Sequence, residues 1–234
     1  MDVKEQWVSV VSDDGFQTQV FVVRPETPAK AAVVVGMEIF GVNEHIQSVC
    51  RRLAQEGYVA LAPQLFDRIE PNVNMAYEAA DVDKGKAFKQ QAESAFQSHI
   101  ASDIQACIDW AYDEEGVNKV GMMGFCWGGL NTWRAAQHAQ GLWAAVCYYG
   151  GGMVDEAQLQ VRPVAPVLAH FSDHDSTTPQ EGIALLQSRY ADEVVVYQYP
   201  ASHGFNCDHR KAYDDGAAQV AWQRSLAFLR MCLV

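Results

Sequence analysis

Apolar and polar positions first alternate along the chain and then gather into continuous apolar runs. Residues 7–11 and 18–23 alternate on either side of Asp13-Asp14-Gly15, which predicts an N-terminal hairpin. The run at 31–35 is wholly apolar, as in a parallel strand that is covered on both faces. Further apolar runs predict strands at 58–62, 120–125, 144–149, 164–171 and 194–199.

Segments with helical character lie between these runs. Apolar residues recur at helical spacing in 100–112, and the other helices are expected at 45–56, 128–138, 180–190 and 216–231. The polar stretch 67–97 has weak periodicity and predicts an excursion that contains a helix. The alternation indicates an α/β fold, with a mostly parallel sheet of about eight strands and helices on both faces. Because no repeat, linker or change in composition interrupts the pattern, we expect a single domain over 1–234.

Composition narrows the expected partners. The chain has 234 residues, 49% of them hydrophobic, and a formal net charge of −12, which disfavours nucleic acid and anionic membranes. No apolar run approaches the roughly 20 residues of a membrane span, and the first residues lack the pattern of a signal peptide. The six cysteines are scattered, without CxxC pairs or metal-ligand spacing. We therefore expect a cytoplasmic monomer without metal or cofactor.

The strongest chemical signal is a cysteine between two glycines. Gly124-Phe125-Cys126-Trp127-Gly128 follows an apolar run and matches the nucleophile elbow of hydrolases, with a thiol in place of serine. The glycines would let strand and helix pass closely, and the N-terminus of the following helix favours a thiolate. The alternative is a buried cysteine in a tight turn.

An acid and a histidine follow in the order that such a hydrolase needs. Asp173 and Asp175 lie just after the run 164–171, and His203 lies just after the run 194–199. Asp175 is favoured over Asp173 because it stands four residues before Pro179, in a loop that turns into the next helix. His174 is the rival of His203, but it precedes the last strand and breaks the expected order.

The loop 37–43 follows a predicted strand at the same edge of the sheet. In this fold such a loop supplies one backbone amide of the oxyanion hole, and the residue after the nucleophile supplies the other. These would be the amides of Ile39 and Trp127. Glu38 is either a surface glutamate or a carboxylate that contacts the thiol and controls its proton.

The chain resembles the dienelactone hydrolase family of the α/β-hydrolase superfamily. The matching pieces span nearly the whole chain: Glu38-Ile39-Phe40-Gly41-Val42-Asn43, Gly57-Tyr58, Ala62-Pro63, Leu65-Phe66, Arg68, Gly124-Phe125-Cys126-Trp127-Gly128-Gly129, Tyr148-Tyr149-Gly150, Asp175 with Pro179, and His203-Gly204-Phe205.

This resemblance implies a carboxymethylenebutenolidase-type hydrolase of small carboxylic esters or lactones. The family opens the enol-lactone 4-carboxymethylenebut-2-en-4-olide to maleylacetate. The resemblance assigns Cys126 as the nucleophile that forms a thioester acyl-enzyme, His203 as base and Asp175 as the orienting acid. Glu38 would help to generate the thiolate when substrate arrives. Phe40, Tyr148, Phe205 and Arg68 are the candidates for the substrate pocket.

The chain departs from the family where arginines hold the substrate carboxylate. Cys207 stands four residues past His203, the stretch 71–97 contains lysines but no arginine, and Arg210 lies out of register. We therefore expect ester or lactone hydrolysis with a preference for neutral substrates. The alternatives are a broad-specificity esterase, a thiol acyltransferase, or a non-catalytic protein that binds ligands or senses redox state through a reactive cysteine.

Overall fold

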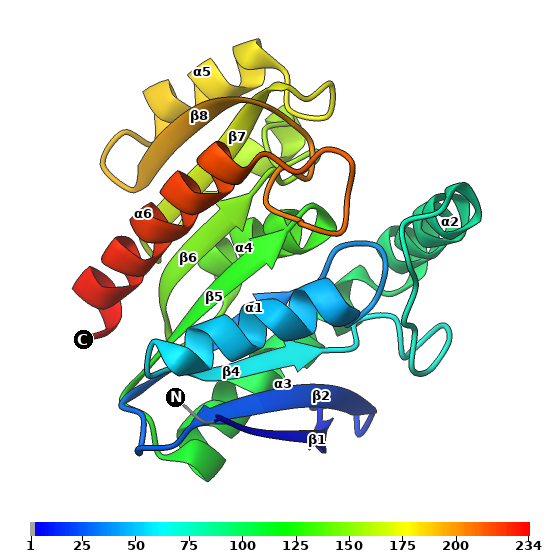
Figure 1. The fold of residues 1–234 in the computed structure, drawn as a ribbon, viewed down its shortest axis with the longest axis vertical. Helices are drawn as coiled ribbons and strands as arrows, with labels where there is room; N and C mark the ends of the chain where they lie inside the picture. The colour runs from blue at the N-terminus through cyan, green and yellow to red at the C-terminus, as the bar shows by residue number, and fades with distance from the viewer. Residues whose placement is uncertain (1–2) are drawn as a thin grey trace.

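The computed structural model describes residues 3–234, and its centre is one eight-stranded sheet. The strand order is β1-β2-β4-β3-β5-β6-β7-β8, with β1 and β2 antiparallel to their neighbours and the others parallel (Figure 1). This confirms the predicted α/β fold and its mostly parallel sheet. The strands are β1 (Val3–Val11), β2 (Gln17–Pro25), β3 (Ala31–Gly36), β4 (Val59–Pro63), β5 (Lys119–Phe125), β6 (Leu142–Tyr148), β7 (Val167–His174) and β8 (Val194–Ser202).

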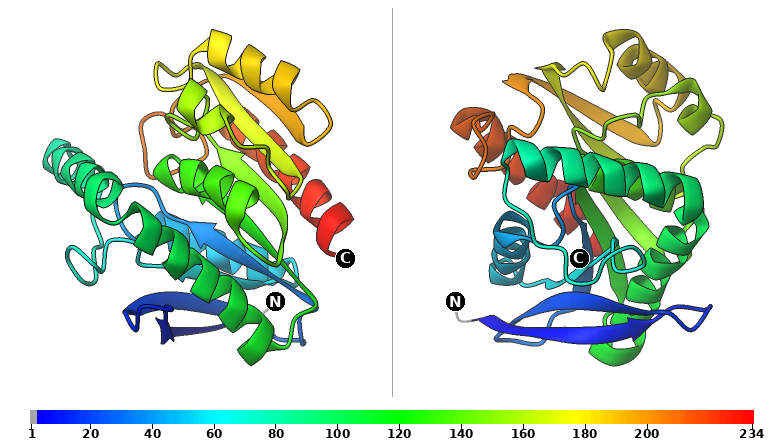
Figure 2. Two further views of the ribbon diagram at one scale, coloured as in Figure 1. Left: turned by 180° about the vertical axis from the view of Figure 1, so that it is seen from behind. Right: turned by 90° about the vertical axis from the view of Figure 1, so that its right-hand side faces the viewer.

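Helices cover both faces of this sheet. Helices α1 and α6 lie on one face, whereas α3 and α4 lie on the other (Figures 1 and 2). The helices are α1 (Glu44–Gln55), α2 (Ala79–Ala95), α3 (Gln97–Glu115), α4 (Trp127–His138), α5 (Gln180–Arg189) and α6 (Asp215–Leu233), with a 3-10 turn at Glu156–Leu159. Because β3 and β4 lie between the two layers, every residue in them is buried, as their continuous apolar runs indicate.

Helix α1 shows how the sequence fixes an element beside the sheet edge. Its N-cap is Asn43, whose side chain accepts a hydrogen bond from the Ile46 amide at 3.4 Å. The buried residues of α1 recur at helical spacing and face β2, β3 and β4. The cap therefore sets where the chain leaves the loop that follows β3.

Strand β7 extends further than the pattern predicted. The expected strand ended at Phe171, but pairing with β8 continues through Ser172 with Tyr199 and His174 with Ser202. Asp173 is consequently an exposed strand residue, and Asp175 is the first acid beyond the strand.

The polar stretch 67–97 contains the predicted helix, α2, which runs past Phe96 into α3. The views in Figures 1 and 2 place α2 at the end of the molecule toward which β5 points. Gly85 of α2 packs against the loop after β3, since a Cβ atom there would lie 2.4 Å from the Ile39 carbonyl oxygen. The excursion therefore covers the edge of the sheet that carries the candidate residues.

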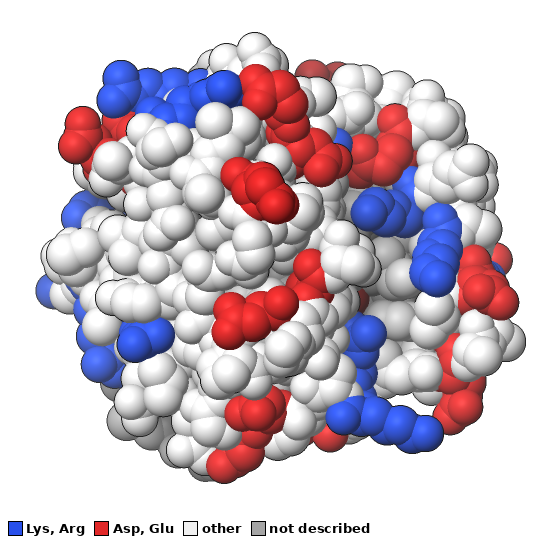
Figure 3. Space-filling view, turned by 90° about the horizontal axis from the view of Figure 1, so that it is seen from above, with Lys and Arg blue, Asp and Glu red and all other residues white. Residues whose placement is uncertain are grey.

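The surface carries a net negative charge without one dominant patch on the face drawn in Figure 3. Acidic and basic side chains there lie among each other on a mostly uncharged surface. Within residues 3–234, no helix combines the length and the apolar character needed to cross a membrane.

Candidate active site

Cys126 sits at a strained turn between β5 and α4. Its backbone has φ 55° and ψ −115°, a conformation that L-residues other than glycine seldom adopt. Holding such a residue costs on the order of 1–3 kcal/mol, so the surroundings must enforce it. The Cys126 amide donates a hydrogen bond to the Tyr148 carbonyl at 3.0 Å, and its side chain is half-buried. The turn therefore presents the thiol at the carboxyl edge of the sheet.

Two glycines allow this turn. A Cβ atom on Gly124 would lie 2.1 Å from the Gly128 carbonyl oxygen, and one on Gly128 would lie 2.2 Å from that of Gly36. Neither approach is possible for any other residue. The close passage of strand and helix that the sequence predicted is thus present at both glycines.

Asp175 and His203 form a direct pair beside this turn. The His203 Nδ1 atom lies 2.6 Å from the Asp175 Oδ2 atom. The other carboxylate oxygen of Asp175 accepts from the Thr177 amide at 2.9 Å and from the Thr177 hydroxyl at 2.6 Å. Asp175 is buried, while Asp173 and His174 are exposed. Of the two aspartates, Asp175 is the one that contacts His203.

The charges in this group favour a protonated His203. Burial opposes the imidazolium, but the Cys126 sulfur and the Asp175 carboxylate outweigh it and raise the pKa of His203 to about 10. Burial also opposes the ionised form of Asp175, yet the bonds from His203 and Thr177 hold its pKa below the usual value. These contacts stabilise the protonated imidazole of His203 and the ionised carboxylate of Asp175.

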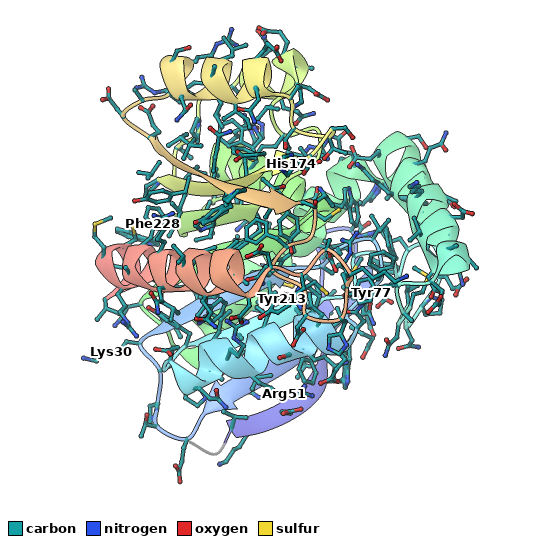
Figure 4. The ribbon with its side chains drawn as sticks, turned by 45° about the horizontal axis from the view of Figure 1, so that its top comes forward. Lys30, Arg51, Tyr77, His174, Tyr213 and Phe228 are labelled. Atoms are coloured by element: carbon teal, nitrogen blue, oxygen red, sulfur yellow. The ribbon has the colours of Figure 1, made fainter. Side chains whose placement is uncertain are left out.

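Glu38 is fully buried, so the surface-glutamate reading is wrong. Its Oε2 atom accepts a hydrogen bond from the Tyr77 hydroxyl at 3.0 Å, and its Oε1 atom accepts one from Arg210 Nη1 at 3.0 Å. Figure 4 shows Tyr77 across from the loop that leads into α6, the loop that carries Arg210. In this state the carboxylate is paired with Arg210 and Tyr77.

Arg210 is the functional candidate that sequence reasoning set aside. It reaches Glu38 because the chain turns at Gly204, where φ is +88° and a Cβ atom would lie 2.6 Å from Arg210 Nη1. The number of residues between His203 and Arg210 does not reveal that the loop turns Arg210 back toward Glu38. Burial disfavours the charged guanidinium, but Glu38 and the other anionic neighbours raise the pKa of Arg210. The structure therefore brings Arg210, which lies out of register in the sequence, into contact with Glu38.

Three of the four pocket candidates lie elsewhere or beneath the site. Arg68 is bound to Asp103 at 2.7 Å and to Asp14 at 2.7 Å, and it packs over the Phe16 ring, so its guanidinium is already paired with two carboxylates. Tyr148 and Phe205 have no exposed surface. The Tyr148 hydroxyl contacts the Ser225 hydroxyl at 2.7 Å, in the core.

Two aromatic residues do lie close to the polar groups. The Phe40 ring is 4.6 Å from the Tyr77 ring and 5.9 Å from the Arg210 guanidinium. Tyr149, which matches the family in sequence but was not predicted as a site residue, has φ 36° and places its ring 5.1 Å from that of His203. A residue held at positive φ next to a strained cysteine is a signal that only the backbone reveals.

The backbone amides of Ile39 and Trp127 lie where two segments reach the same edge. Trp127 opens α4, and Ile39 belongs to the loop after β3. No hydrogen bond within residues 3–234 uses either amide. The Trp127 ring stacks on Phe66 at 4.9 Å and donates to Glu93 of α2 at 2.6 Å, which ties α2 to the turn.

One buried group in the described part of the chain could hold a metal ion. It consists of Glu38, His45 and Cys207, whose candidate ligand atoms all lie within 4.8 Å of one another. Burial opposes a charged His45, but Asp208, Cys207 and Glu38 together raise the pKa of His45 to about 9. This group adjoins the active-site candidates through Glu38.

An eight-stranded, mostly parallel sheet with a strained residue between a strand and a glycine-lined helix defines an α/β hydrolase. The family model described as "Dienelactone hydrolase family" matches residues 18–233. The chain belongs to this family, and it is a hydrolase that acts on esters or lactones.

Individual relatives agree with this assignment. A Salmonella typhi protein that carries the name carboxymethylenebutenolidase is 35% identical over 236 residues, which cover 94% of this chain and 84% of that protein. A protein of the same name from Escherichia coli K12 is 36% identical over 212 residues, which cover 85% of this chain and 76% of that protein. The crystal structure of a dienelactone hydrolase from Klebsiella pneumoniae superposes with a TM-score of 0.84 at 31% identity, covering 98% of this chain and 99% of that one.

Proposed function

We propose that the chain hydrolyses carboxylic esters and lactones through a Cys126-His203-Asp175 triad and a thioester acyl-enzyme. The observation that carries this proposal is the 2.6 Å contact between His203 Nδ1 and Asp175, beside a cysteine held at φ 55°. A buried carboxylate that orients an imidazole next to a strained nucleophile is the arrangement that acyl transfer requires. The names of the relatives support the same class of substrate.

The residues fit a two-step reaction. His203 accepts the thiol proton, and the Cys126 thiolate attacks the carbonyl carbon to form a tetrahedral oxyanion. The amides of Ile39 and Trp127 stabilise that oxyanion, and the leaving oxygen takes the proton from His203 as the carbon–oxygen bond breaks. Water then attacks the thioester, with His203 again as base, and releases the acid and the free thiol.

Glu38 and Arg210 supply a way to couple thiol activation to substrate binding. A substrate carboxylate would compete with Glu38 for the Arg210 guanidinium, whose planar fork binds carboxylates well. A released Glu38 could then turn toward Cys126, accept the thiol proton and pass it on to His203, which matches the thiolate-generating role that the family resemblance implies. Arg210 thus supports the carboxylated dienelactone as a substrate, and it removes the reason for expecting a preference for neutral ones.

The test is a panel of p-nitrophenyl esters, neutral lactones and the carboxylated dienelactone, assayed under reducing conditions. We expect hydrolysis of the lactone, and loss of it in Cys126→Ala. A thiol acyltransferase would instead transfer the acyl group to an added thiol faster than to water. A redox-sensing protein would turn over none of the panel.

A further inference from the structure

We propose that Glu38, His45 and Cys207 form a binding site for a thiophilic divalent ion of the Zn²⁺ class, which shares Glu38 with the active-site candidates. Each residue offers one ligand atom, and the three atoms lie within 4.8 Å of one another. All three residues are buried, with exposed fractions for the whole residue of 0% for Glu38, 2% for His45 and 0% for Cys207. Binding of the ion at this site does not depend on the proposed function. The expected effect of the ion on turnover does rest on the proposed function.

The site is assembled by the fold from three distant segments. Glu38 follows β3, His45 lies in α1, and Cys207 lies in the loop after β8. The three residues carry no short metal-binding motif, because 162 positions separate His45 from Cys207. Packing of α1 against the sheet and the return of the loop after β8 bring them together.

The ligand types fit zinc better than they fit the alkaline-earth ions. Zinc binds a thiolate sulfur at about 2.3 Å and imidazole nitrogen or carboxylate oxygen at about 2.0–2.2 Å, and magnesium and calcium prefer oxygen alone. Tetrahedral ligands of that size stand about 3.5 Å apart, so small side-chain rotations would close the present group around an ion. The Cys207 thiol proton would leave to the buffer as the sulfur–metal bond forms.

Unpartnered polar atoms mark the same region. The Nε2 atom of His45 is buried without a hydrogen-bond partner in residues 3–234, and so are both amide atoms of Asn206. His45 and Asn206 also line a pocket of about 260 Å³, together with Asp208 and Asp215. Tyr213, which Figure 4 shows on the loop leading into α6, lies at this pocket too. The pocket lining holds the carboxylates of Asp208 and Asp215 against the single guanidinium of Arg52, and His45 connects the pocket to the three-residue group.

An ion at this site would restrain the residue that the proposed mechanism needs to move. Glu38 already accepts bonds from Arg210 and Tyr77, and its oxygens retain free lone pairs for a metal. A third partner would hold the carboxylate against Arg210 and away from Cys126. We therefore expect Zn²⁺ to inhibit hydrolysis without contacting Cys126.

The decisive experiment uses Co²⁺ as a coloured substitute for Zn²⁺ on the full-length, reduced protein. Binding should be one ion per chain, with the absorption that a cobalt–thiolate bond produces, and Zn²⁺ should displace the cobalt. Cys207→Ser should lose that absorption. His45→Gln should weaken binding at least about tenfold, since even outer partners of a metal ligand are worth about 10–100-fold. Cys126→Ser is the matched control and should keep both absorption and affinity.

The converse pattern would overturn the proposal. If Cys126→Ser abolishes the absorption while Cys207→Ser retains it, the ion binds the Cys126-His203 pair instead. Absence of stoichiometric cobalt binding by the wild type would overturn it equally. Circular dichroism of the metal-free variants checks their folding, and Cys207→Ala replaces Cys207→Ser if the latter does not fold.

Inhibition provides a second readout. The Zn²⁺ inhibition constant should rise at least about tenfold in His45→Gln relative to the wild type. An unchanged constant would mean that zinc inhibits through another site. Because cobalt absorption needs no turnover, failure of the hydrolase mechanism would leave the binding test intact.

Discussion

Arg210 reaches back across the loop after β8 and donates a hydrogen bond to Glu38, 172 positions earlier, at 3.0 Å. The side chain of Glu38 is 1% exposed and that of Arg210 is 22% exposed, so the arginine forms the solvent-facing half of the pair. An incoming anion would therefore meet Arg210 before it met Glu38. This order of access links substrate charge to the state of the buried carboxylate.

Replacing Arg210 should separate the two substrate types. Arg210→Ala removes the cation for a substrate carboxylate, so kcat/KM for the carboxylated dienelactone should fall at least about a hundredfold. For a neutral ester the loss should stay below about tenfold. Steady-state kinetics on both substrates measure this, with the neighbouring Lys211→Ala as control. Equal losses on both substrates would show that Arg210 does not select for charge.

The same replacement should also reduce stability, because it leaves Glu38 buried without its cation. We expect Arg210→Ala to lower the free energy of unfolding by about 1–3 kcal/mol, and Glu38→Gln in the same chain to restore much of it. Urea unfolding of both single variants and the double variant measures the coupling. Additive single effects would mean that the two residues do not stabilise each other.

Glu38→Gln should cut kcat sharply yet leave KM nearly unchanged. A glutamine can still accept the bond from Arg210, but it cannot take the thiol proton. Tyr77→Phe is the matched comparison, since it removes only the hydroxyl that contacts Glu38, and it should have a smaller effect. An unaltered kcat in Glu38→Gln would assign Glu38 a purely structural role.

Gly85→Ala should disturb catalysis from outside the site. Its new Cβ atom would lie 2.4 Å from the Ile39 carbonyl oxygen, so the loop that carries the Ile39 amide must shift. Loss of one oxyanion donor lowers kcat by about 10²–10³-fold, and partial displacement should cost about tenfold or more. The control is Lys86→Ala, an exposed neighbour on α2. If both variants keep wild-type kcat, α2 does not position the oxyanion loop.

The pKa of His203 should depend on Cys126. It is raised from 6.5 to about 10 largely by the sulfur, so Cys126→Ser should lower it. The pKa of His203 in the folded protein is higher than its usual value of 6.5. The contacts of protonated His203 therefore stabilise the fold fully below about pH 6.5, and this stabilisation is lost as the pH rises through about 10. NMR titration of the His203 ring in both proteins tests the shift. Identical titration midpoints would contradict the pairing of the two side chains.

The sequence predicted the secondary-structure elements and the order of the candidate site residues better than it predicted the contacts of individual side chains. Continuous apolar runs revealed the buried strands, and the succession of Cys126, Asp175 and His203 after three of them placed these residues at one edge. Asp175 rather than Asp173 lies against His203 because β7 continues through His174, which keeps Asp173 in the strand and leaves Asp175 as the first acid beyond it.

The misplaced residues depend on features that a linear pattern does not contain. Arg210 was missed because the positive φ of Gly204 turns its loop back on itself. Tyr148 and Arg68 share motif positions with the family, yet one is bound in the core by Ser225 and the other by Asp14 and Asp103. Similarity at a position does not reveal which way a side chain points or what occupies its hydrogen bonds.

The nucleophilic role of Cys126 is tested most directly by kcat/KM of Cys126→Ala on an ester that the wild type hydrolyses. Circular dichroism checks its fold, and Cys232→Ala, a half-buried thiol near the C-terminus, serves as the control. The proposed triad predicts a loss of at least about a thousandfold in Cys126→Ala and little change in the control. A folded Cys126→Ala that keeps more than about a tenth of the wild-type value would contradict the proposed mechanism.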